Sequence, residues 1–372
     1  DYSFDLMGVL IIPMEYVNFG KAGVKVSRLA LGLGFRGQSD ADEAERAIER
    51  AIELGINFID CANVYGLGDD RANAGSSEQI LGRVLKRHRD DLFISSKVFS
   101  PIGEGPNDSG ASRYHIMREI DRTLGRLDTD HIDVYILHGY DDEAPLDETL
   151  RAMDDLVTSG KTRYVGVSNY RAWQVVKSLW TQDANGLDPL ICIQNPYNLL
   201  NRDLELEMFP AVQSHGFGVM AYSPLAVGLL SGAYVPGESA PAGSLYATVR
   251  AERFDNHMDS DTRAVLDVLH EIATAHDKTV AQTATNWVLS HPEVSVAITG
   301  GDTAEHMEDN IGAVGWELPP EARERLDAVS ASMLAPSTRR ATCAAPISSG
   351  WLPNRFVTAT RTAEPPMLVC TI

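Results

Sequence analysis

The sequence predicts an α/β fold of one architecture, a (β/α)8 TIM barrel. Along most of the chain, short apolar segments typical of strands alternate with amphipathic segments typical of helices. Eight such strand–helix units are found, and a chain of 372 residues is long enough to close them around one core. No Gly-x-Gly-x-x-Gly motif follows any predicted strand, which disfavours an open dinucleotide-binding sheet and favours the closed barrel.

The predicted strands are short runs of apolar residues, and most of them end in a polar residue. Continuous apolar runs of four to six residues are typical of parallel strands buried on both faces. The eight strands are expected at residues 29–33, 57–60, 92–97, 132–137, 164–167, 191–194, 218–222 and 296–299.

The helices between these strands are predicted from apolar residues spaced at i, i+3, i+4 and i+7. Residues 41–54 show this spacing from Ala44 to Ile52, and Gly55 is placed to end the helix. Ser76 and Ser77 are candidate N-caps for a helix at 77–86. Further helices are expected at 146–159, followed by Gly160, and at about 261–275 and 280–290.

Three segments fall outside the alternation. Residues 224–260 are rich in Gly, Pro and Ser, and a long connection after the seventh strand lies on the catalytic face of a barrel, where it can act as a lid. Residues 335–372 lack periodicity and are expected to form a flexible tail. Met14 resembles a natural start, so residues 1–13 are interpreted as an N-terminal extension and 14–334 as the barrel.

Composition and charge argue against several classes of function. The formal net charge of −20 disfavours binding to nucleic acids and anionic membranes. Four scattered cysteines without a CxxC pair favour a reducing compartment over a disulfide scaffold or a structural zinc site. No apolar run reaches the roughly 20 residues of a membrane span, and residues 7–14 do not resemble a signal peptide. We therefore expect a cytoplasmic protein that acts on a small molecule.

Polar side chains at the strand ends are the candidates for chemistry, because barrels carry their functional residues at the carboxyl ends of the strands. Asp60, Lys97 and His138 end the second, third and fourth predicted strands, and Tyr65 lies in the loop after Asp60. The later strands end in a different set of polar residues: Ser168, Asn169, Gln194, Tyr222 and Ser223.

The first four residues suggest one acid–base unit. A tyrosine has an ordinary pKa of about 10, and a neighbouring lysine is expected to lower the pKa of Tyr65. A carboxylate at Asp60 would keep Lys97 charged and in place. His138 can hydrogen-bond a carbonyl oxygen and orient it. The unit suits protonation of an oxygen while a hydride reaches the attached carbon.

An ordered series of motifs places the chain in a family. The motifs are GINFIDCANVYG at 55–66, SSEQILG at 76–82, SKV at 96–98, DVYILH at 133–138, GKTRYVGVSN at 160–169, QNPYN at 194–198 and AYSPLA at 221–226. Together they resemble the aldo-keto reductases, from about Tyr16 to Ala331. The resemblance implies a (β/α)8 oxidoreductase that uses NADP(H) or NAD(H). It implies reduction of an aldehyde or ketone, sugar-like ones included, to an alcohol, or the reverse, by direct hydride transfer.

The resemblance also implies a role for each matching residue. The catalytic residues would be Asp60, Tyr65, Lys97 and His138, with Tyr65 as the general acid–base. The nicotinamide carboxamide would be held by Ser168, Asn169 and Gln194, with its ring stacked on Tyr222. The pyrophosphate would be wrapped by Ser223, Leu225 and the turn through Gly228. The adenosine end would lie against Gly300, Gly301, Asp302, His306, Asp309 and Asn310.

Two departures from the family pattern bear on the choice of cofactor. Members often carry Arg, Lys or Ser where Asp302 stands and Gln where His306 stands, and a basic residue common near Ala233 is absent. The segment 299–310 has no Arg or Lys, which the 2′-phosphate of NADP(H) normally needs, so it suggests that NAD(H) is accepted. Arg250 and Arg253 are the alternative source of positive charge.

Loops at the mouth of a barrel determine which substrate it binds. Residues 66–76, 98–113 and 224–260 are the expected determinants, and Phe35, Phe99 and Tyr140 are candidates for the pocket wall. One alternative function is a cofactor-binding regulatory subunit resembling the potassium-channel β-subunits. Another is a metal-dependent sugar isomerase or hydrolase. That class needs Asp, Glu and His at several strand ends, whereas Lys, Ser, Asn, Gln and Tyr stand there, and we predict no metal site.

Overall fold

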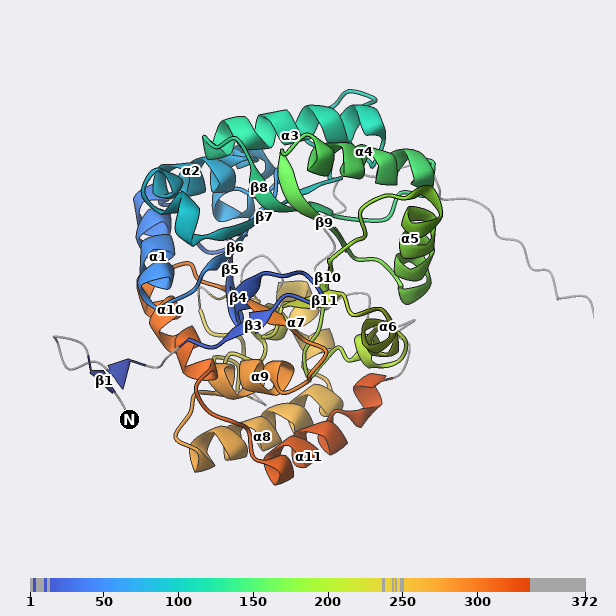
Figure 1. Cartoon of the computed structure of the whole chain (residues 1–372). Helices are drawn as coiled ribbons and strands as arrows, with labels where there is room; N and C mark the ends of the chain where they lie inside the picture. Colours follow the sequence, from blue (N-terminus) through green and yellow to red (C-terminus); the bar gives the residue numbers. More distant parts are fainter. Residues whose placement is uncertain are drawn as a thin grey trace, which may run out of the picture.

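Eight parallel strands close into a barrel in the computed structural model, which describes residues 3–4, 10–11, 14–235, 238–242, 244, 246–247 and 251–334. Each strand pairs with its neighbours in the chain, and the last closes onto the first through Leu29 and Ala297. This confirms the predicted barrel (Figure 1). The strands are β5 (Leu29–Gly32), β6 (Phe58–Asp60), β7 (Phe93–Val98), β8 (Ile132–Leu137), β9 (Thr162–Ser168), β10 (Cys192–Pro196), β11 (Gly218–Tyr222) and β12 (Val296–Gly300).

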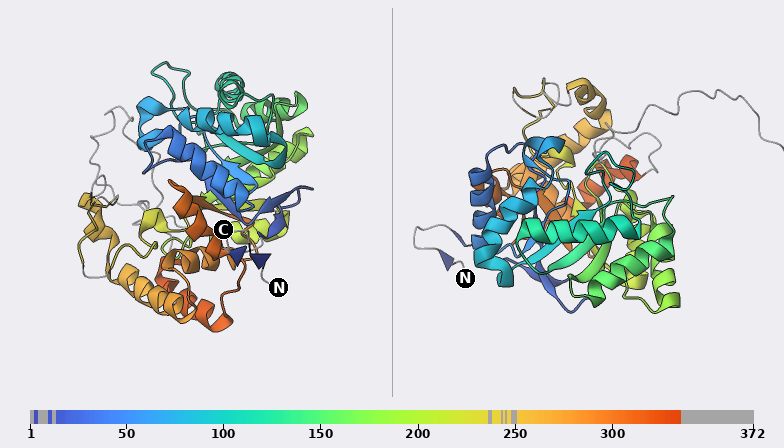
Figure 2. Two further views of the ribbon diagram at one scale, coloured as in Figure 1. Left: turned by 90° about the vertical axis from the view of Figure 1, so that its left-hand side faces the viewer. Right: turned by 90° about the horizontal axis from the view of Figure 1, so that it is seen from above.

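Helices surround the barrel on its outside, as Figures 1 and 2 show. The helices predicted at 41–54, 77–86, 146–159, 261–275 and 280–290 are confirmed as α1, α2, α4, α8 and α9. The helices are α1 (Ala41–Glu53), α2 (Ser76–His88), α3 (Arg113–Leu127), α4 (Leu146–Thr158), α5 (Ala172–Asn185), α6 (Met208–His215), α7 (Ala251–His257), α8 (Ser260–Ala275), α9 (Val280–Leu289), α10 (Ala304–Asn310) and α11 (Pro320–Val329). In the part of the chain that is described, no helix is long and apolar enough to cross a membrane.

The start of α2 differs from the prediction. The N-cap is Gly75, with a left-handed φ of 85°, and neither Ser76 nor Ser77 caps the helix. The Oγ of Ser76 instead accepts a hydrogen bond from Leu67 N at 3.0 Å. The amide of Gly75 donates to Tyr65 O at 3.0 Å. A glycine is favoured at this φ, and the turn that it allows fixes the loop that carries Tyr65.

The inside of the barrel is filled by apolar side chains at its amino-terminal end. A hairpin of β3 (Tyr16–Asn18) and β4 (Lys25–Ser27) crosses this end, as Figure 1 shows. Its turn buries Phe19 completely, and the ring meets Phe58 edge to face at 5.5 Å between centroids. Phe58 in turn meets Phe93 at 5.0 Å. These rings fill the amino-terminal end of the barrel, and functional residues of such barrels lie at the opposite, carboxyl-terminal mouth.

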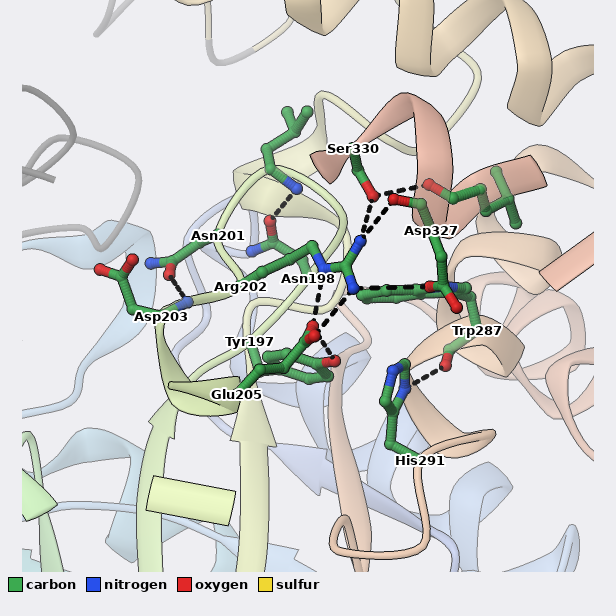
Figure 3. A network of polar contacts seen from close by, with 12 residues as sticks. Tyr197, Asn198, Asn201, Arg202, Asp203, Glu205, Trp287, His291, Asp327 and Ser330 are labelled. Atoms are coloured by element: carbon green, nitrogen blue, oxygen red, sulfur yellow. Dashed lines mark hydrogen bonds and ion pairs between the residues drawn. The ribbon is translucent and has the colours of Figure 1, made fainter. Parts of the chain in front are cut away.

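A buried polar network fastens the C-terminal helix to the barrel (Figure 3). Arg202 pairs with Glu205 and donates to Ser330 Oγ at 2.9 Å, just after α11. Its guanidinium lies 5.3 Å from the ring of Trp287 in α9, and Trp287 Nε1 donates to Asp327 Oδ1 at 2.9 Å. One arginine thereby ties the loop after β10 to α9 and α11.

The division of the chain into an extension, a barrel and a tail stays a prediction. Residues 3–4 and 10–11 form a short antiparallel pair, β1 (Ser3–Phe4) with β2 (Leu10–Ile11). The rest of the predicted extension and the predicted tail at 335–372 lie outside the described residues. The segment 224–260, predicted as a lid, contains α7. Phe254 of α7 packs against Tyr234, with 5.7 Å between ring centroids.

Candidate active site

Four side chains predicted to act together lie together at the carboxyl-terminal mouth. Lys97 Nζ is fully buried and donates to Asp60 Oδ2 at 2.7 Å and to Cys61 O at 2.7 Å. The same ammonium lies 4.6 Å from the centroid of the Tyr65 ring. The hydroxyl of Tyr65 is 3.3 Å from Nε2 of His138. A buried ion pair thus lies beneath a phenol whose oxygen faces an imidazole.

Strand register brings the ion pair together. Asp60 is the last residue of β6 and pairs with Ser95 of β7. Side chains two apart on a strand share a face, so Ser95 and Lys97 both point into the barrel beside Asp60. Tyr65 then follows a turn in which its amide donates to Ala62 O at 3.1 Å.

The Asp60 carboxylate accepts more hydrogen bonds than the sequence suggested. Ser95 Oγ donates to Oδ1 at 2.6 Å, and Gln194 Nε2 donates to the same oxygen at 2.9 Å. Both partners are buried. Ser95 was not a predicted site residue, although its position two residues before Lys97 on a strand is a signal that could have identified it.

The pKa of Tyr65 differs from the prediction. Burial raises it, Lys97 lowers it and Asp60 raises it, so the pKa lies above its ordinary value. The predicted effect of Lys97 has the right sign, but the expectation of a lowered pKa is wrong because the loss of solvent exceeds it. Burial also disfavours the charged form of Lys97, yet Asp60 and Tyr65 outweigh this effect and raise its pKa. Lys97 therefore stays charged.

His138 is held neutral. Burial lowers its pKa well below the ordinary value, and the positive charges of Lys97 and Arg71 lower it further. Among the described residues, nothing hydrogen-bonds its buried Nδ1. The backbone amide of His138 donates to Val98 O at 2.8 Å. A neutral imidazole in this position keeps one N–H to donate and one nitrogen to accept.

The residues predicted to hold a nicotinamide lie on the adjacent strand ends. Asn169 Nδ2 donates to His138 O at 2.9 Å, and its Oδ1 accepts from the hydroxyl of Tyr222 at 2.8 Å. Ser168 Oγ donates to Gln194 O at 2.7 Å. Asn169 also has a left-handed φ of 61°. The contacts join the ends of β8, β9, β10 and β11 and fix the Tyr222 ring beside the exposed amide of Asn169.

The backbone after β11 is strained where the pyrophosphate was predicted to lie. Ser223, Ala226 and Val227 have φ values of 54°, 48° and 59°, and Gly228 follows at 94°. Left-handed backbone at a β-branched residue such as Val227 is rare, and strained residues of this kind gather at functional sites. Leu225 O accepts from Gly228 N at 2.9 Å and closes the turn. Amide and hydroxyl groups at the strand ends, an oriented ring and this turn together fit a nicotinamide dinucleotide.

The segment predicted to meet the adenosine end is largely engaged in internal contacts. Asn310 Nδ2 donates to Gly300 O at 2.9 Å, and Asp309 accepts from Gln282 of α9 at 2.9 Å. A Cβ on Gly301 would collide with the side chain of Met307, which would have to move to admit it. His306 is exposed on the first turn of α10.

Asp302 connects two loops of the mouth. Its Oδ2 accepts from Gly37 N at 3.1 Å, and its carbonyl accepts from Gln38 Nε2 at 2.5 Å. Burial raises the pKa of Asp302, opposed by His306, Gly37 and Arg36. Arg250 and the side chain of Arg253, the alternative cations, lie outside what the structure describes.

The three predicted pocket residues lie on different loops of the mouth. Phe35 is buried with a left-handed φ of 43°, and its carbonyl accepts from Gly68 N at 3.0 Å. Phe99 lies against Gly139. Tyr140 meets Tyr170 and Trp173 with centroid distances of 5.1 and 5.9 Å. Across the described residues, no group of three His, Cys, Asp or Glu side chains is arranged to hold a metal ion.

The barrel and its buried Lys–Asp pair under a tyrosine define a class of protein, a (β/α)8 enzyme with a candidate acid–base site at the mouth. Residues 28–331 match the aldo/keto reductase family. The chain belongs to that family and is an oxidoreductase, and the family's general chemistry is NAD(P)-dependent carbonyl reduction.

Curated relatives match most of the chain. An uncharacterized oxidoreductase of Bacillus subtilis, YrpG, is 36% identical over 84% of this chain and 95% of its own length. A probable voltage-gated potassium channel subunit beta of Oryza sativa subsp. japonica is 36% identical over 85% and 96%. The L-glyceraldehyde 3-phosphate reductase of Escherichia coli K12 is 34% identical over 81% and 88%. The family thus includes both enzymes and proteins named as channel subunits.

Proposed function

We propose that this protein reduces an aldehyde or ketone, or oxidises the matching alcohol, with Tyr65 as the general acid–base. The observation that carries the proposal is the position of the Tyr65 hydroxyl, 3.3 Å from Nε2 of His138 and above the buried pair of Lys97 and Asp60. A phenol in this setting can give its proton to a carbonyl oxygen, and the nearby ammonium stabilises the phenolate that remains.

Each of the other three residues has a separate task in this proposal. His138 is neutral, and its Nε2 faces the hydroxyl of Tyr65. It would therefore donate a hydrogen bond to the substrate oxygen that Tyr65 protonates, and so orient the carbonyl. Asp60 keeps the buried Lys97 charged. In alcohol oxidation the phenolate of Tyr65 takes the hydroxyl proton back, so the same residues serve both directions.

The cofactor would be a nicotinamide dinucleotide, which supplies the hydride when bound. Ser168, Asn169 and Gln194 would hold its carboxamide, and the Tyr222 ring would lie against its nicotinamide. The hydrogen bond from Tyr222 to Asn169, at 2.8 Å, supports this role because it orients the ring before any ligand arrives. The left-handed turn from Ser223 to Gly228 would follow the pyrophosphate.

We further propose that NAD(H) is accepted at least as well as NADP(H). Asp302 presents a carboxylate where a 2′-phosphate would need a cation, and it can accept hydrogen bonds from a free ribose hydroxyl. The bond from Gly37 occupies only Oδ2. The N-terminus of α10 would favour a phosphate by only about 0.3–1 kcal/mol at an exposed site.

A regulatory role is the second candidate, and it is favoured by the 36% identity to the protein named as a probable potassium channel subunit. The presence of Asp60, Tyr65, Lys97 and His138 together favours catalysis over binding alone. Repeated turnover of cofactor would distinguish the two, since a subunit that only binds cofactor would oxidise no more than one equivalent.

The proposed function is tested with a panel of aldehydes, keto-sugars and sugar alcohols, run with both cofactors and read by the absorbance of the reduced nicotinamide. We expect multiple turnovers with at least one carbonyl, and loss of this activity in Tyr65→Phe. If the protein binds the cofactor but turns over no member of the panel, the regulatory role is favoured.

A further inference from the structure

Arg71 stands out among the residues of the mouth that the proposed chemistry does not use. It begins the short 3-10 helix Arg71–Asn73 in the loop after β6, the loop that also carries Tyr65. Its side chain is partly buried, and Nη1 donates to Pro101 O in the loop after β7 at 3.1 Å. Its charge is close enough to lower the pKa of His138. The bond to Pro101 therefore holds Arg71 between the loops after β6 and β7, at the rim of the mouth.

The guanidinium of Arg71 is only partly satisfied. A guanidinium has five N–H donors, and the bond to Pro101 uses one of them. Within the described ranges, no carboxylate forms an ion pair with Arg71. Partial burial lowers the Arg71 pKa below its ordinary value, and the charge of Asp69 offsets only part of this effect. Asp70 instead accepts from Ala72 N at 2.9 Å. A partly desolvated cation with spare donors at a catalytic mouth is suited to an anion.

A second arginine lies on the neighbouring loop of the mouth. Arg36 is exposed on the loop after β5, and its charge acts on Tyr65, Tyr222 and Asp302. The loops that carry Arg36 and Arg71 are joined, because Gly68 N donates to Phe35 O and Gln38 O at 3.0 and 2.8 Å. On a protein with a net charge of −20, two arginines on neighbouring loops of the mouth are an exception to the acidic composition.

We propose that Arg71, with Arg36 on the neighbouring loop after β5, binds an anionic group of the carbonyl substrate, a phosphate or a carboxylate close to the reacting carbonyl. The inference rests on the proposed function, since it names the substrate class of the same site. A guanidinium matches both anions through paired N–H donors. Arg71 lies in the same loop as Tyr65, so the anion would bind near the carbonyl that Tyr65 protonates.

Matched substrates test the proposal. Butanal is compared with succinic semialdehyde, and glycolaldehyde with glycolaldehyde phosphate, as the ratio of kcat/KM for the charged member over the neutral one. We expect a wild-type ratio well above one for one or both pairs. Since hydrogen bonds to charged groups are strong, the ratio should fall roughly tenfold or more in Arg71→Gln and less in Arg71→Lys, which keeps the charge. A ratio that Arg71→Gln leaves unchanged would overturn the proposal.

The control is Arg83→Gln, which removes an exposed arginine of α2 that pairs with Asp42 and Glu45 away from the mouth. It changes the net charge by the same amount, so an equal fall of the ratio in Arg83→Gln would mean that overall charge, and not a site, is responsible. The two substrate pairs also separate a phosphate site from a carboxylate site.

A binding measurement separates failure of this inference from failure of the proposed function. Titration calorimetry with glycerol 3-phosphate and with succinate, against glycerol as the neutral probe, is run at saturating oxidised cofactor in wild type and Arg71→Gln. We expect saturable binding of at least one anion that weakens about tenfold or more in the variant. Anion binding that depends on Arg71 without any carbonyl turnover would contradict only the proposed function. Equal affinity in the two proteins would overturn the anion site.

Discussion

Replacing Lys97 with methionine tests how the buried pair controls Tyr65. The ammonium lies 4.6 Å from the centroid of the Tyr65 ring, so a phenolate there would gain about 3–4 kcal/mol at an effective dielectric constant of about 20. This energy corresponds to about two to three pKa units. Asp60 opposes the effect and solvent at the mouth screens it, so we expect Lys97→Met to raise the Tyr65 pKa by about one to two units.

The rate of alcohol oxidation reports this shift directly. Below its pKa, the fraction of Tyr65 present as phenolate falls tenfold for each unit by which the pKa rises. Oxidation by Lys97→Met should therefore be about 10- to 100-fold slower than wild type at any pH below that pKa, and its pH profile should be displaced to higher pH. Carbonyl reduction should also slow, because a phenol of higher pKa is the weaker acid.

Removing both charges provides the control. Lys97 lowers the Tyr65 pKa more than Asp60 raises it, so Lys97→Met/Asp60→Asn should show a profile between those of wild type and Lys97→Met. Cofactor affinity, measured by quenching of protein fluorescence, checks that each variant is folded. A Lys97→Met profile that overlays wild type in height and position would refute the coupling of Lys97 to Tyr65.

Three further predictions follow from other contacts. Ser95→Ala removes a hydrogen bond to Asp60 and should lower kcat about tenfold with a displaced pH profile. The control Ser96→Ala, which loses a bond to Glu78 instead, should keep the pH profile of wild type. The same displacement in both variants would show that Ser95 does not position Asp60. Glu205→Gln should lower the free energy of unfolding by about 1–3 kcal/mol at neutral pH, because buried Arg202 loses its bidentate partner and keeps only the longer ion pair with Asp327, against less than about 1 kcal/mol for the exposed control Glu271→Gln. Burial acts to raise the Glu205 pKa, but hydrogen bonds from Arg202 and Tyr197 outweigh it and lower the pKa. The difference in unfolding free energy between wild type and Glu205→Gln, measured with urea, should therefore be complete above the unfolded-state pKa of about 4.3 and narrow as the pH falls through the lower folded-state pKa. A difference that does not depend on pH would show that the charge of Glu205 is not its cause. Asp302→Arg should lower the ratio of kcat/KM for NADH over NADPH by about tenfold or more, and Asp302→Asn should give a ratio between those of Asp302→Arg and wild type. A wild-type preference for NADPH of about a hundredfold would show that Asp302 does not select NAD(H).

The barrel could be predicted from the sequence because its strands have a simple pattern. Strands buried on both faces are continuous apolar runs, and in β7 every residue from Phe93 to Val98 is buried. The candidate site could be predicted for a related reason. Polar residues such as Asp60 and Lys97 interrupt these runs at one end of each strand, and a closed barrel brings those ends to one mouth.

Other features depend on contacts that a linear sequence does not display. The start of α2 was predicted from the capping preference of serine, but the left-handed turn at Gly75, tied to Tyr65, determines it. The sign of the Tyr65 pKa shift depends on how much water the fold removes from the ring. Arg71 lies in the segment 66–76, which was expected to help determine the substrate, but its bond to Pro101 can be seen only in the folded chain.

The central claim is that a hydride reaches a carbonyl carbon while Tyr65 protonates the oxygen. Single-turnover reduction with nicotinamide deuterated at the transferring position tests it directly, in wild type and in Tyr65→Phe. We predict that deuterium appears on the carbinol carbon of the product, about 10²- to 10⁴-fold more slowly in Tyr65→Phe, with nearly unchanged cofactor affinity. A product without deuterium, or a Tyr65→Phe rate above about a tenth of wild type with chemistry rate-limiting, would contradict the claim.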